Sequence, residues 1–326
     1  MDAKTVLVTG IGGNVGQGIL RNIRSLDFPI KVFGCDICSF SPGNHLCDKF
    51  FKVPYSYDED FIPKIMDIVD AEKIDMIIPS TDYEVYYLAL HRSEINAIIL
   101  ASDADIAKKF LDKYLTFQMF QQYDIPFAKS WLPKDYDNTE ETIIAKPRKG
   151  RGSRGIIKNA QNVSELGDEY MVQPMYKGIE ITTTMYFNKS GAVHGIFSLE
   201  RELNNGMTSK TIVNNKYNDQ FEKMGLKMKR LGGIRGSINI QSIVDVHNSI
   251  FPFEINCRIS GTNSIRHHLG FQDVKYAIQE YLFDETPDAI NIKKGKGVAT
   301  RIFMDVIYPD ATGFNDIDNS TKHIIY

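Results

Sequence analysis

The sequence predicts an N-terminal α/β region with a parallel sheet, followed by an α+β region with antiparallel sheets. Two observations carry this prediction. In the first third of the chain, short apolar runs alternate with helical segments, as in a parallel sheet covered by helices. After residue 140 the expected strands are often amphipathic and are joined by turn residues such as "NKSG". A chain of 326 residues can form two such domains, and we place them at 1–102 and 103–326.

The elements of the first domain follow from the positions of the apolar runs. The expected strands are 5–9, 30–36, 75–80 and 97–102. One expected helix follows the glycine cluster and begins after residue 18. Two further helices are expected at 58–74 and 84–95. A single helix through 104–123 should lead into the second domain, where two prolines end it.

The glycine cluster "VTGIGGNVGQG" follows the first strand and opens a helix, a context that favours a phosphate-binding turn. Asp36 ends the second strand, where a ribose-binding acid is expected in dinucleotide-binding proteins. The spacing of Gly10, Gly13 and Gly16 is similar to that of extended short-chain dehydrogenases. Those enzymes need a Tyr-x-x-x-Lys pair, and no tyrosine here has a lysine four residues on. An NAD(P)-dependent oxidoreductase is therefore an alternative, and we favour a tight turn without cofactor or one that touches substrate.

Composition narrows the class of protein. The formal net charge is −3, so a basic face for nucleic acid is not expected. We expect no membrane span, because no run of about 18 apolar residues exists. We expect no secretory signal, because the N-terminus lacks a basic region followed by a long apolar core. Four cysteines in so long a chain fit free thiols in a cytoplasmic protein. A zinc site at Cys35, Cys38, His45 and Cys47 is the weaker interpretation, because the spacing fits common zinc patterns poorly.

The stretch "AKPRKGRGSRG", residues 145–155, combines five positive side chains with three glycines. The positive residues are Lys146, Arg148, Lys149, Arg151 and Arg154. Because the basic run is local while the chain as a whole is slightly acidic, it favours one small anionic ligand, such as a triphosphate. A basic surface turn is the alternative.

The stretch "FPFEINCRISG", residues 251–261, has the pattern of a strand with polar and apolar faces. Period 2 places Glu254, Asn256 and Arg258 on one face. An upstream strand, 236–244, alternates likewise and carries Gln241, and the two strands should form a hairpin with their polar faces side by side. Oxygen ligands on rigid strands suit Mg²⁺, and an arginine beside them can hold a phosphate. A solvated sheet face is the alternative.

Together these segments resemble the ATP-grasp superfamily, and most closely its branch like the carbamoyl-phosphate synthase large subunit, with a single ATP-grasp unit. The resemblance covers almost the whole chain in the right order. It implies a linker helix at 103–123, a small lid lobe at about 127–180 and a large lobe at about 181–326. The segments that carry it are "VLVTGIGGNVGQG", "IIPSTDYE", "LDKYLTFQMFQQYDIPFAKSW", "AKPRKGRGSRG", "MVQPMYKGIEIT", "GSINIQ" and "FEINCR".

The resemblance assigns roles at the nucleotide site. Lys113 and Lys146 would contact the phosphates of ATP, while the glycine loop folds over them. The loop residues concerned are Gly150, Gly152, Ser153 and Gly155. At the hinge, the backbone around Gln173 and Met175 would meet the adenine, and Glu180 would bind the ribose hydroxyls.

The resemblance also implies a metal site and the catalytic residues. Gln241, Glu254 and Asn256 would bind one or two Mg²⁺ ions, with Mn²⁺ as an alternative, and Lys146 and Arg258 would be catalytic. The implied activity is an ATP-dependent carboxylate–amine ligase that works through an acyl phosphate and releases ADP and phosphate. Its partners would be a small-molecule carboxylate and an amine, and a homodimer is expected by analogy.

Two other functions stay open beside the ligase. The chain could instead be the oxidoreductase considered above, or a catalytically silent nucleotide-binding module. Four side chains are candidates for holding the substrate: Asp82, Glu84, Arg201 and Lys210. Exposed loop charges are an equally good interpretation of Arg201 and Lys210.

Overall fold

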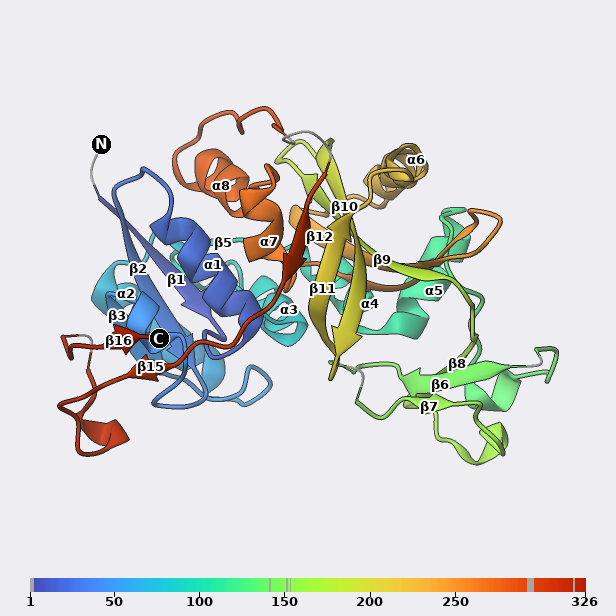
Figure 1. Cartoon of the computed structure of the whole chain (residues 1–326), viewed down its shortest axis with the longest axis horizontal. Helices are drawn as coiled ribbons and strands as arrows, with labels where there is room; N and C mark the ends of the chain where they lie inside the picture. The colour runs from blue at the N-terminus through green and yellow to red at the C-terminus, as the bar shows by residue number, and fades with distance from the viewer. Residues whose placement is uncertain (1–2, 141, 151, 153, 292–295, 319) are drawn as a thin grey trace.

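The computed structural model describes residues 3–140, 142–150, 152, 154–291, 296–318 and 320–326. An N-terminal α/β region forms one end of the molecule, and a six-stranded and a three-stranded antiparallel sheet form most of the rest (Figure 1). The smaller sheet projects from the end opposite the N-terminal region. The predicted fold class is confirmed.

The N-terminal region is a five-stranded parallel sheet in the order β3-β2-β1-β4-β5. Its strands are β1 (Lys4–Thr9), β2 (Ile30–Asp36), β3 (Lys49–Lys52), β4 (Met76–Ile78) and β5 (Ile98–Ile99). Helices α1 (Asn14–Arg24), α2 (Phe61–Glu72) and α3 (Asp82–Leu90) cover it. Val6 and Val8 face the core that contains α1, whereas Leu7 faces the core that contains α2 and α3, so side chains alternate as a doubly covered sheet requires. The sequence did not predict β3.

The single helix predicted through 104–123 is wrong, because two helices occupy this segment. They are α4 (Ala104–Leu111) and α5 (Lys113–Gln122). Asp112 between them has extended backbone, and its Oδ1 accepts hydrogen bonds from the backbone N–H groups of Tyr114 and Leu115. This is an N-cap, which satisfies N–H groups that a new helix leaves free. Apolar periodicity continues through the break and therefore hides it.

The large sheet has six antiparallel strands in the order β13-β12-β9-β10-β11-β14. They are β9 (Ile179–Phe187), β10 (Val193–Asn204), β11 (Met207–Val213), β12 (Gly236–Val244), β13 (Ile250–Asn256) and β14 (Val298–Thr300). The predicted hairpin is confirmed as β12 and β13, with Gln241 opposite Glu254 and Asn239 opposite Asn256. The apolar face of the sheet packs against α4, α5 and α6 (Asn218–Met228).

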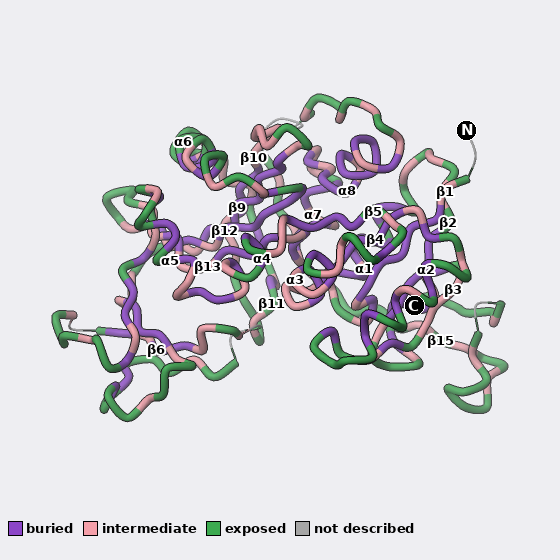
Figure 2. Tube along the Cα trace, turned by 180° about the vertical axis from the view of Figure 1, so that it is seen from behind, coloured by how far each residue is buried: buried purple, intermediate pink, exposed green. Residues whose placement is uncertain are grey.

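The small sheet has three strands in the order β7-β6-β8. They are β6 (Ile143–Pro147), β7 (Ile157–Lys158) and β8 (Tyr170–Pro174). This lobe has its own small apolar core, centred on Ile143, Ala145 and Val172. Figure 2 shows mostly exposed backbone around it, in contrast to the buried strands of the large sheet.

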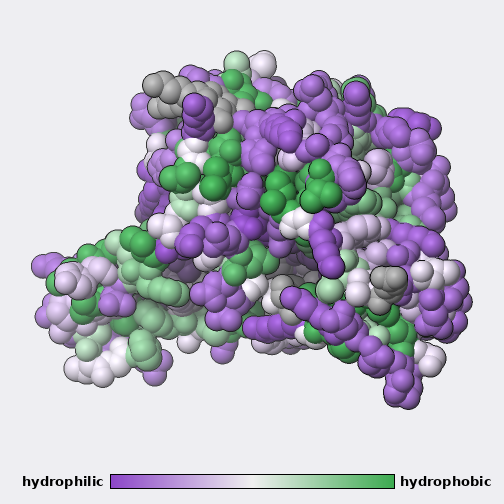
Figure 3. Space-filling model, turned by 45° about the vertical axis from the view of Figure 1, so that its right-hand side comes forward, coloured by the Kyte–Doolittle hydropathy of each residue, from purple (hydrophilic) through white to green (hydrophobic). Residues whose placement is uncertain are grey.

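The C-terminal segment returns to the N-terminal region. It runs from β14 towards β3 and ends in a pair of short strands, β15 (Val306–Ile307) and β16 (Ile324–Ile325) (Figure 1). The ring of Phe40 contacts the rings of Tyr308 and Phe314 there. Hydrophilic residues dominate the surface in Figure 3, and apolar ones form separate groups. None of the helices in the described ranges has the length and apolar character needed to cross a membrane.

Helix α7 (Asn263–His268) joins the large sheet to the N-terminal region. The Nδ2 of Asn263 donates to the carbonyl of Val15, and its Oδ1 accepts from Asn22 of α1. A Cβ at Gly18 would lie 2.4 Å from the same Oδ1 atom, so only glycine allows this approach. The glycine-rich segment therefore serves interdomain packing at this position.

A fully buried ion pair holds the chain that follows β13. Its members are Arg266 of α7 and Asp273 of α8 (Asp273–Ala277), and neither side chain has any exposed area. The Nη1 of Arg266 also donates to the hydroxyls of Ser260 and Thr262, at 2.8 and 3.0 Å, and Asp273 accepts from Ser237 of β12. Because every partner is satisfied, the cluster fixes the position of residues 260–262 behind the hairpin.

We predict that Arg266→Met lowers the free energy of unfolding by about 3–5 kcal/mol, because Asp273 is left buried without a counter-charge. Urea denaturation followed by circular dichroism measures this. Arg230→Met, at an exposed position, is the control and should change stability by less than about 0.5 kcal/mol. A loss in Arg266→Met no larger than that of the control would contradict the assignment.

Candidate active site

Glu254 of β13 lies at the meeting point of the two sheets. Lys113, the first residue of α5, places its Nζ 3.8 Å from Glu254 Oε2 and donates a hydrogen bond to the carbonyl of Gly150. The interruption between α4 and α5 at Asp112 sets the direction in which α5 starts, and so brings Lys113 to this point. The predicted phosphate-contacting lysine thus joins the glycine loop to the predicted metal ligand.

Lys146 of β6 reaches the same place from the small sheet. Its Nζ donates to the carbonyl of Phe253 at 2.9 Å and lies 5.0 Å from the centre of the Phe253 ring. Burial lowers the pKa of Lys146 to about 7, the charge of Lys113 acts in the same direction, and Glu254 opposes both. Burial alone would raise the pKa of Glu254, but Lys113, Lys146, the hydrogen bond from Asn256 and the charge of Arg201 together outweigh it and lower that pKa. Glu254 is therefore ionised at neutral pH.

Amide side chains extend the site along the hairpin. The Nδ2 of Asn256 donates to Glu254 Oε1 at 3.1 Å, and the Nε2 of Gln241 donates to Asn256 Oδ1 at 3.2 Å. The Oε1 of Gln241 in turn accepts from Arg201, which also pairs with Glu180. The oxygens of Glu254, Asn256 and Gln241 form a donor set that fits Mg²⁺, provided that phosphate oxygens and water complete the shell.

Arg258 directly follows this hairpin and contacts the N-terminal region. Its Nε and Nη2 both lie 2.9 Å from Oδ2 of Asp82, the first residue of α3. The second oxygen of Asp82, Oδ1, is buried without a hydrogen-bond partner among the described residues. The predicted phosphate-binding arginine thus pairs with a predicted substrate residue, 176 positions away in the sequence.

The positive side chains of the glycine loop do not all have the same role. Arg148 was predicted to face the phosphates, but it forms an ion pair of 2.7 Å with the buried carboxylate of Asp112. That part of the prediction is wrong for the structure as it stands, because Arg148 anchors the loop to the start of α5. Gly152 and Gly155 have φ of 63° and 72°, which favours glycine. Ser153 and Arg151 lie outside the described residues.

The predicted hinge residues lie where the small sheet joins the large one. The Nε2 of Gln173, on β8, donates to Ser130 Oγ at 2.9 Å, and the backbone N–H of Met175 donates to the carbonyl of Thr142. Glu180, at the start of β9, is the partner of Arg201. Lys210 is exposed and pairs with Glu202, so it does not join this cluster.

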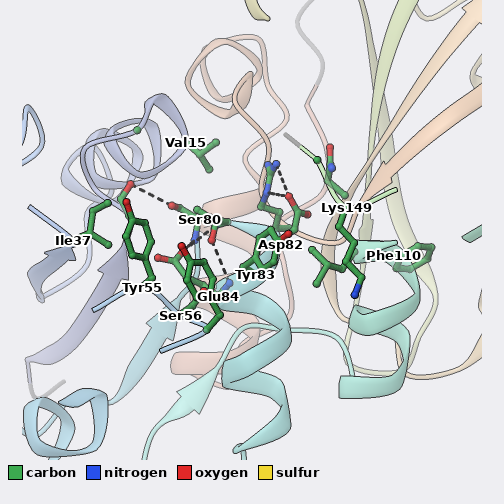
Figure 4. Close-up of a pocket in the computed structure, with 18 of the residues that line it drawn as sticks. Val15, Ile37, Tyr55, Ser56, Ser80, Asp82, Tyr83, Glu84, Phe110 and Lys149 are labelled. Atoms are coloured by element: carbon green, nitrogen blue, oxygen red, sulfur yellow. Dashed lines mark hydrogen bonds and ion pairs between the residues drawn. The ribbon is translucent and has the colours of Figure 1, made fainter. Parts of the chain in front are cut away.

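A cleft of about 550 Å³ adjoins the cluster (Figure 4). One wall is formed by the strand ends of the N-terminal region, where the glycine turn (Gly10, Gly13), Asp36 and residues 80–84 lie. The other wall is formed by the end of α4, Lys113, the start of the glycine loop and the end of β13. Asn256 and Arg258 line this second wall, so the cleft opens directly onto the predicted metal and phosphate residues.

Tyr55 and Tyr57 also line the cleft, although the sequence did not predict them as site residues. They follow β3, the strand that the sequence did not predict. A Tyr-x-Tyr pair just after an apolar run was the available signal.

Two family models match the chain. Residues 6–100 match the N-terminal domain of PylC-like proteins, and residues 110–262 match an ATP-grasp domain. No curated protein is significantly similar to this chain in sequence.

Solved structures of similar fold cover nearly the whole chain. N5-carboxyaminoimidazole synthetase from Staphylococcus aureus, complexed with ADP, is 16% identical with a TM-score of 0.75, over 92% of this chain and 82% of that chain. A second similar structure is the biotin carboxylase domain of 2-oxoglutarate carboxylase from Hydrogenobacter thermophilus, complexed with MgADP and bicarbonate. It is 13% identical with a TM-score of 0.73, over 95% of this chain and 76% of that chain. Together with the family models, they confirm the predicted superfamily and fold.

The low pKa of Lys146 has a measurable effect on stability. Its pKa is 10.5 in the unfolded chain and about 7 in the folded one. Between these values the unfolded state holds a proton that the folded state lacks, so stability rises with pH; below about 7 the full cost of burying the charge is present. We predict that Lys146→Met is most stable relative to wild type below pH 7, and that this advantage shrinks by about 1.4 kcal/mol per unit up to pH 9.

Urea denaturation from pH 6 to 9 tests this prediction, with the exposed Lys108→Met as control. The difference between control and wild type should not vary with pH. An equally flat difference for Lys146→Met would show that Lys146 is not buried as described.

Proposed function

The chain belongs to the ATP-grasp superfamily, and from this premise we propose that it is an ATP-dependent carboxylate–amine ligase. The observation that carries the proposal is the position of Glu254, held between Lys113 and Lys146 beside two amide oxygens, next to a cleft that Lys113 and Asn256 line. We assign residues 1–102 to the domain before the ATP-grasp unit and 103–326 to that unit. Its lid lobe covers about 127–180 and its large lobe about 181–326, with two helices as the linker.

The nucleotide would bind between the small and large sheets. In this proposal Lys146 and Lys113 face its phosphates, and the glycine loop, with Gly150, Gly152 and Gly155 among the described residues, supplies backbone N–H groups above them. At the hinge, the backbone around Gln173 and Met175 receives the adenine, and Glu180 the ribose. In this proposal Arg201 orients Glu180, since the two are already paired.

Glu254, Asn256 and Gln241 would hold Mg²⁺, as one or two ions, with Mn²⁺ as an alternative. When bound, the metal neutralises charge on the phosphate oxygens. Lys146 supplies a positive charge at the transferring phosphoryl group. Its pKa of about 7 lies close to neutral pH, so the negative charge of an incoming phosphate favours the protonated form. Arg258, oriented by Asp82, faces the oxygens that gain charge during transfer.

The chemical steps need positioning and no nucleophile on the protein. A substrate carboxylate in the cleft attacks the γ-phosphorus of ATP, so that an acyl phosphate forms and ADP leaves. An amine then attacks the acyl carbon, loses a proton and releases phosphate, which leaves an amide bond. Asn256 and Arg258 lie on the wall between nucleotide and cleft, so both reacting groups meet there.

Two details complete the proposal. The free cysteines, of which Cys35, Cys47 and Cys257 are buried thiols, fit a cytoplasmic location. The homodimer remains an expectation by analogy with superfamily members such as the biotin carboxylase domain dimer.

The oxidoreductase alternative has no supporting observation. The backbone N–H of Gly12 donates to Asp36 Oδ2, and the sequence has no Tyr-x-x-x-Lys pair for proton transfer. The silent nucleotide-binding module predicts MgATP binding without turnover. Phosphate release from MgATP, measured across a panel of carboxylates with and without amines, separates it from a ligase.

We predict that Glu254→Gln lowers ATP turnover by about 100-fold or more, since the lost charge acts on the transition state. Phosphate release with the best acceptor of the panel measures this. Glu222→Gln, an exposed carboxylate on α6, is the matched control and should keep full turnover. Near-normal turnover in Glu254→Gln would mean that β13 does not carry the metal.

We also predict that MgATP raises the melting temperature and that NADPH does not. A ligand that binds only the folded state at about 100 times its Kd adds about 2.7 kcal/mol of stability. Differential scanning fluorimetry with each nucleotide tests this. A rise with NADPH and none with MgATP would contradict the proposed function.

A further inference from the structure

The two walls of the cleft carry opposite charges. The ionisable groups on the N-terminal wall are Asp36, Asp82, Glu84 and three tyrosines, with no lysine, arginine or histidine among the described lining residues. The opposite wall carries Lys113, Lys149 and Arg258, and no described lining residue there is acidic. A cleft divided in this way favours a ligand with a positive group at one end and a negative group at the other.

Most of these charges are already used within the protein. Asp82 pairs with Arg258, and Lys113 lies beside Glu254. Glu84 is buried and accepts hydrogen bonds from the backbone N–H groups of Ser80 and Thr81. No ion pair among the described residues involves Asp36, Glu84 or Lys149. Because Glu84 is buried, Asp36 and Lys149 are the charged groups that remain for a ligand on the two walls.

Asp36 is held in place although it has no cation. Its Oδ2 accepts from the backbone N–H of Gly12 at 2.8 Å, and its Oδ1 accepts from that of Cys38 at 3.2 Å. Lys149, in contrast, is exposed at the start of the glycine loop. A fixed carboxylate thus faces a long side chain that can follow its ligand.

Aromatic rings surround the acidic end. Tyr55 and Tyr57 stack with ring centres 5.2 Å apart, and Tyr57 meets the edge of Tyr83 at 6.1 Å. Tyr55 and Tyr57 are 42% and 54% exposed, so two stacked aromatic rings lie open to solvent at the cleft. Exposed apolar groups that lie together often mark a binding site. Rings beside a carboxylate are the usual surroundings of a bound ammonium group.

Figure 4 shows how these groups are arranged. Tyr55 and Ile37 lie at one end of the cleft, Lys149 and Phe110 lie at the other, and Asp82 lies between them. Arg258 and Asn256 line the wall towards Lys149. A ligand that spans the cleft would therefore present its negative end to the place where phosphoryl transfer is proposed.

We propose that the carboxylate substrate is a zwitterion whose ammonium group binds at Asp36 and the rings of Tyr55 and Tyr57, while its carboxylate lies at Lys149 and Arg258. The inference rests on the proposed function, because it names the substrate class of that site. It assigns specificity to the N-terminal region, and in particular to three residues outside the ATP-binding strands. The glycine turn then contacts substrate and holds Asp36 in position through Gly12.

A nucleoside ribose at Asp36 is the competing occupant. It would use the carboxylate as a hydroxyl acceptor, which does not require a cation. It would also leave the exposed charge of Lys149 without a role unless a phosphate followed. The separation of charges favours the zwitterion, and adenosine and ribose 5-phosphate belong in the test.

The experiment is isothermal titration calorimetry of the full chain, with and without MgADP. The probes are straight-chain ω-amino carboxylates from glycine to 6-aminohexanoate, together with ornithine and lysine. Each is compared with the carboxylate that lacks the amine and with the amine that lacks the carboxylate. We expect at least one zwitterion to bind about tenfold or more tightly than both of its single-charge analogues, the gain expected from a charged hydrogen bond.

Variants show where the preference arises. Asp36→Asn should reduce the preference for the zwitterion over the amine-free carboxylate by about tenfold and leave MgADP binding unchanged. Tyr55→Leu should weaken the same preference, whereas Tyr55→Phe, which keeps the ring, should retain it. Glu59→Gln removes an exposed acid outside the cleft and should have no effect.

Three outcomes would overturn the inference: no zwitterion preferred over its analogues, a preference that Asp36→Asn leaves intact, or tighter binding of adenosine or ribose 5-phosphate that depends on Asp36. Any of these with normal MgADP binding rejects the substrate class and leaves the ligase proposal standing. Failure to bind MgADP would instead reject the proposed function.

Discussion

A largely buried carboxylate held between two lysines is the interaction on which the rest of the site depends. Glu254 comes from the large sheet, Lys146 from the small sheet and Lys113 from the start of α5. Taking three charges out of water is costly unless each has a partner. When Lys146 is protonated, two positive charges face one negative charge, so the cluster then has a net attraction for an anion. In the proposed function an incoming phosphate would supply the missing charge, and would thereby couple ligand binding to the contact between the two sheets.

The surrounding structure places these three charges. Asp112 ends α4, caps α5 and binds Arg148, so one side chain fixes both the direction of Lys113 and the start of the glycine loop. The buried pair of Arg266 and Asp273 fixes the chain just beyond β13. Arg258 with Asp82, and Asn263 with Val15, then join this frame to the N-terminal region. Arg258 and Asp82 lie on opposite walls of the cleft, so their contact joins the two walls.

Local periodicity in the sequence was enough to predict the hairpin that carries the site. Alternation of polar and apolar residues predicts that the faces of Gln241 and Glu254 lie side by side, and the pairing of β12 with β13 confirms it. The break at Asp112 escaped prediction because a single capping side chain overrides a helical pattern that continues on both sides. The partners of Arg148 and Arg258 could not be predicted, since they depend on contacts 36 and 176 residues distant in the chain. Tyr55 and Tyr57 were missed with β3, a four-residue strand without clear alternation.

The central claim is that a substrate carboxylate accepts the γ-phosphoryl group of ATP in the cleft beside Glu254. The most direct test uses an acceptor carboxylate labelled with ¹⁸O in both oxygens, with mass spectrometry of the phosphate released after amide formation. An acyl phosphate intermediate leaves one carboxylate oxygen on the phosphorus, so the account predicts one ¹⁸O atom in each released phosphate. Unlabelled phosphate accompanied by amide product would contradict the account, because the carboxylate would then never have been phosphorylated.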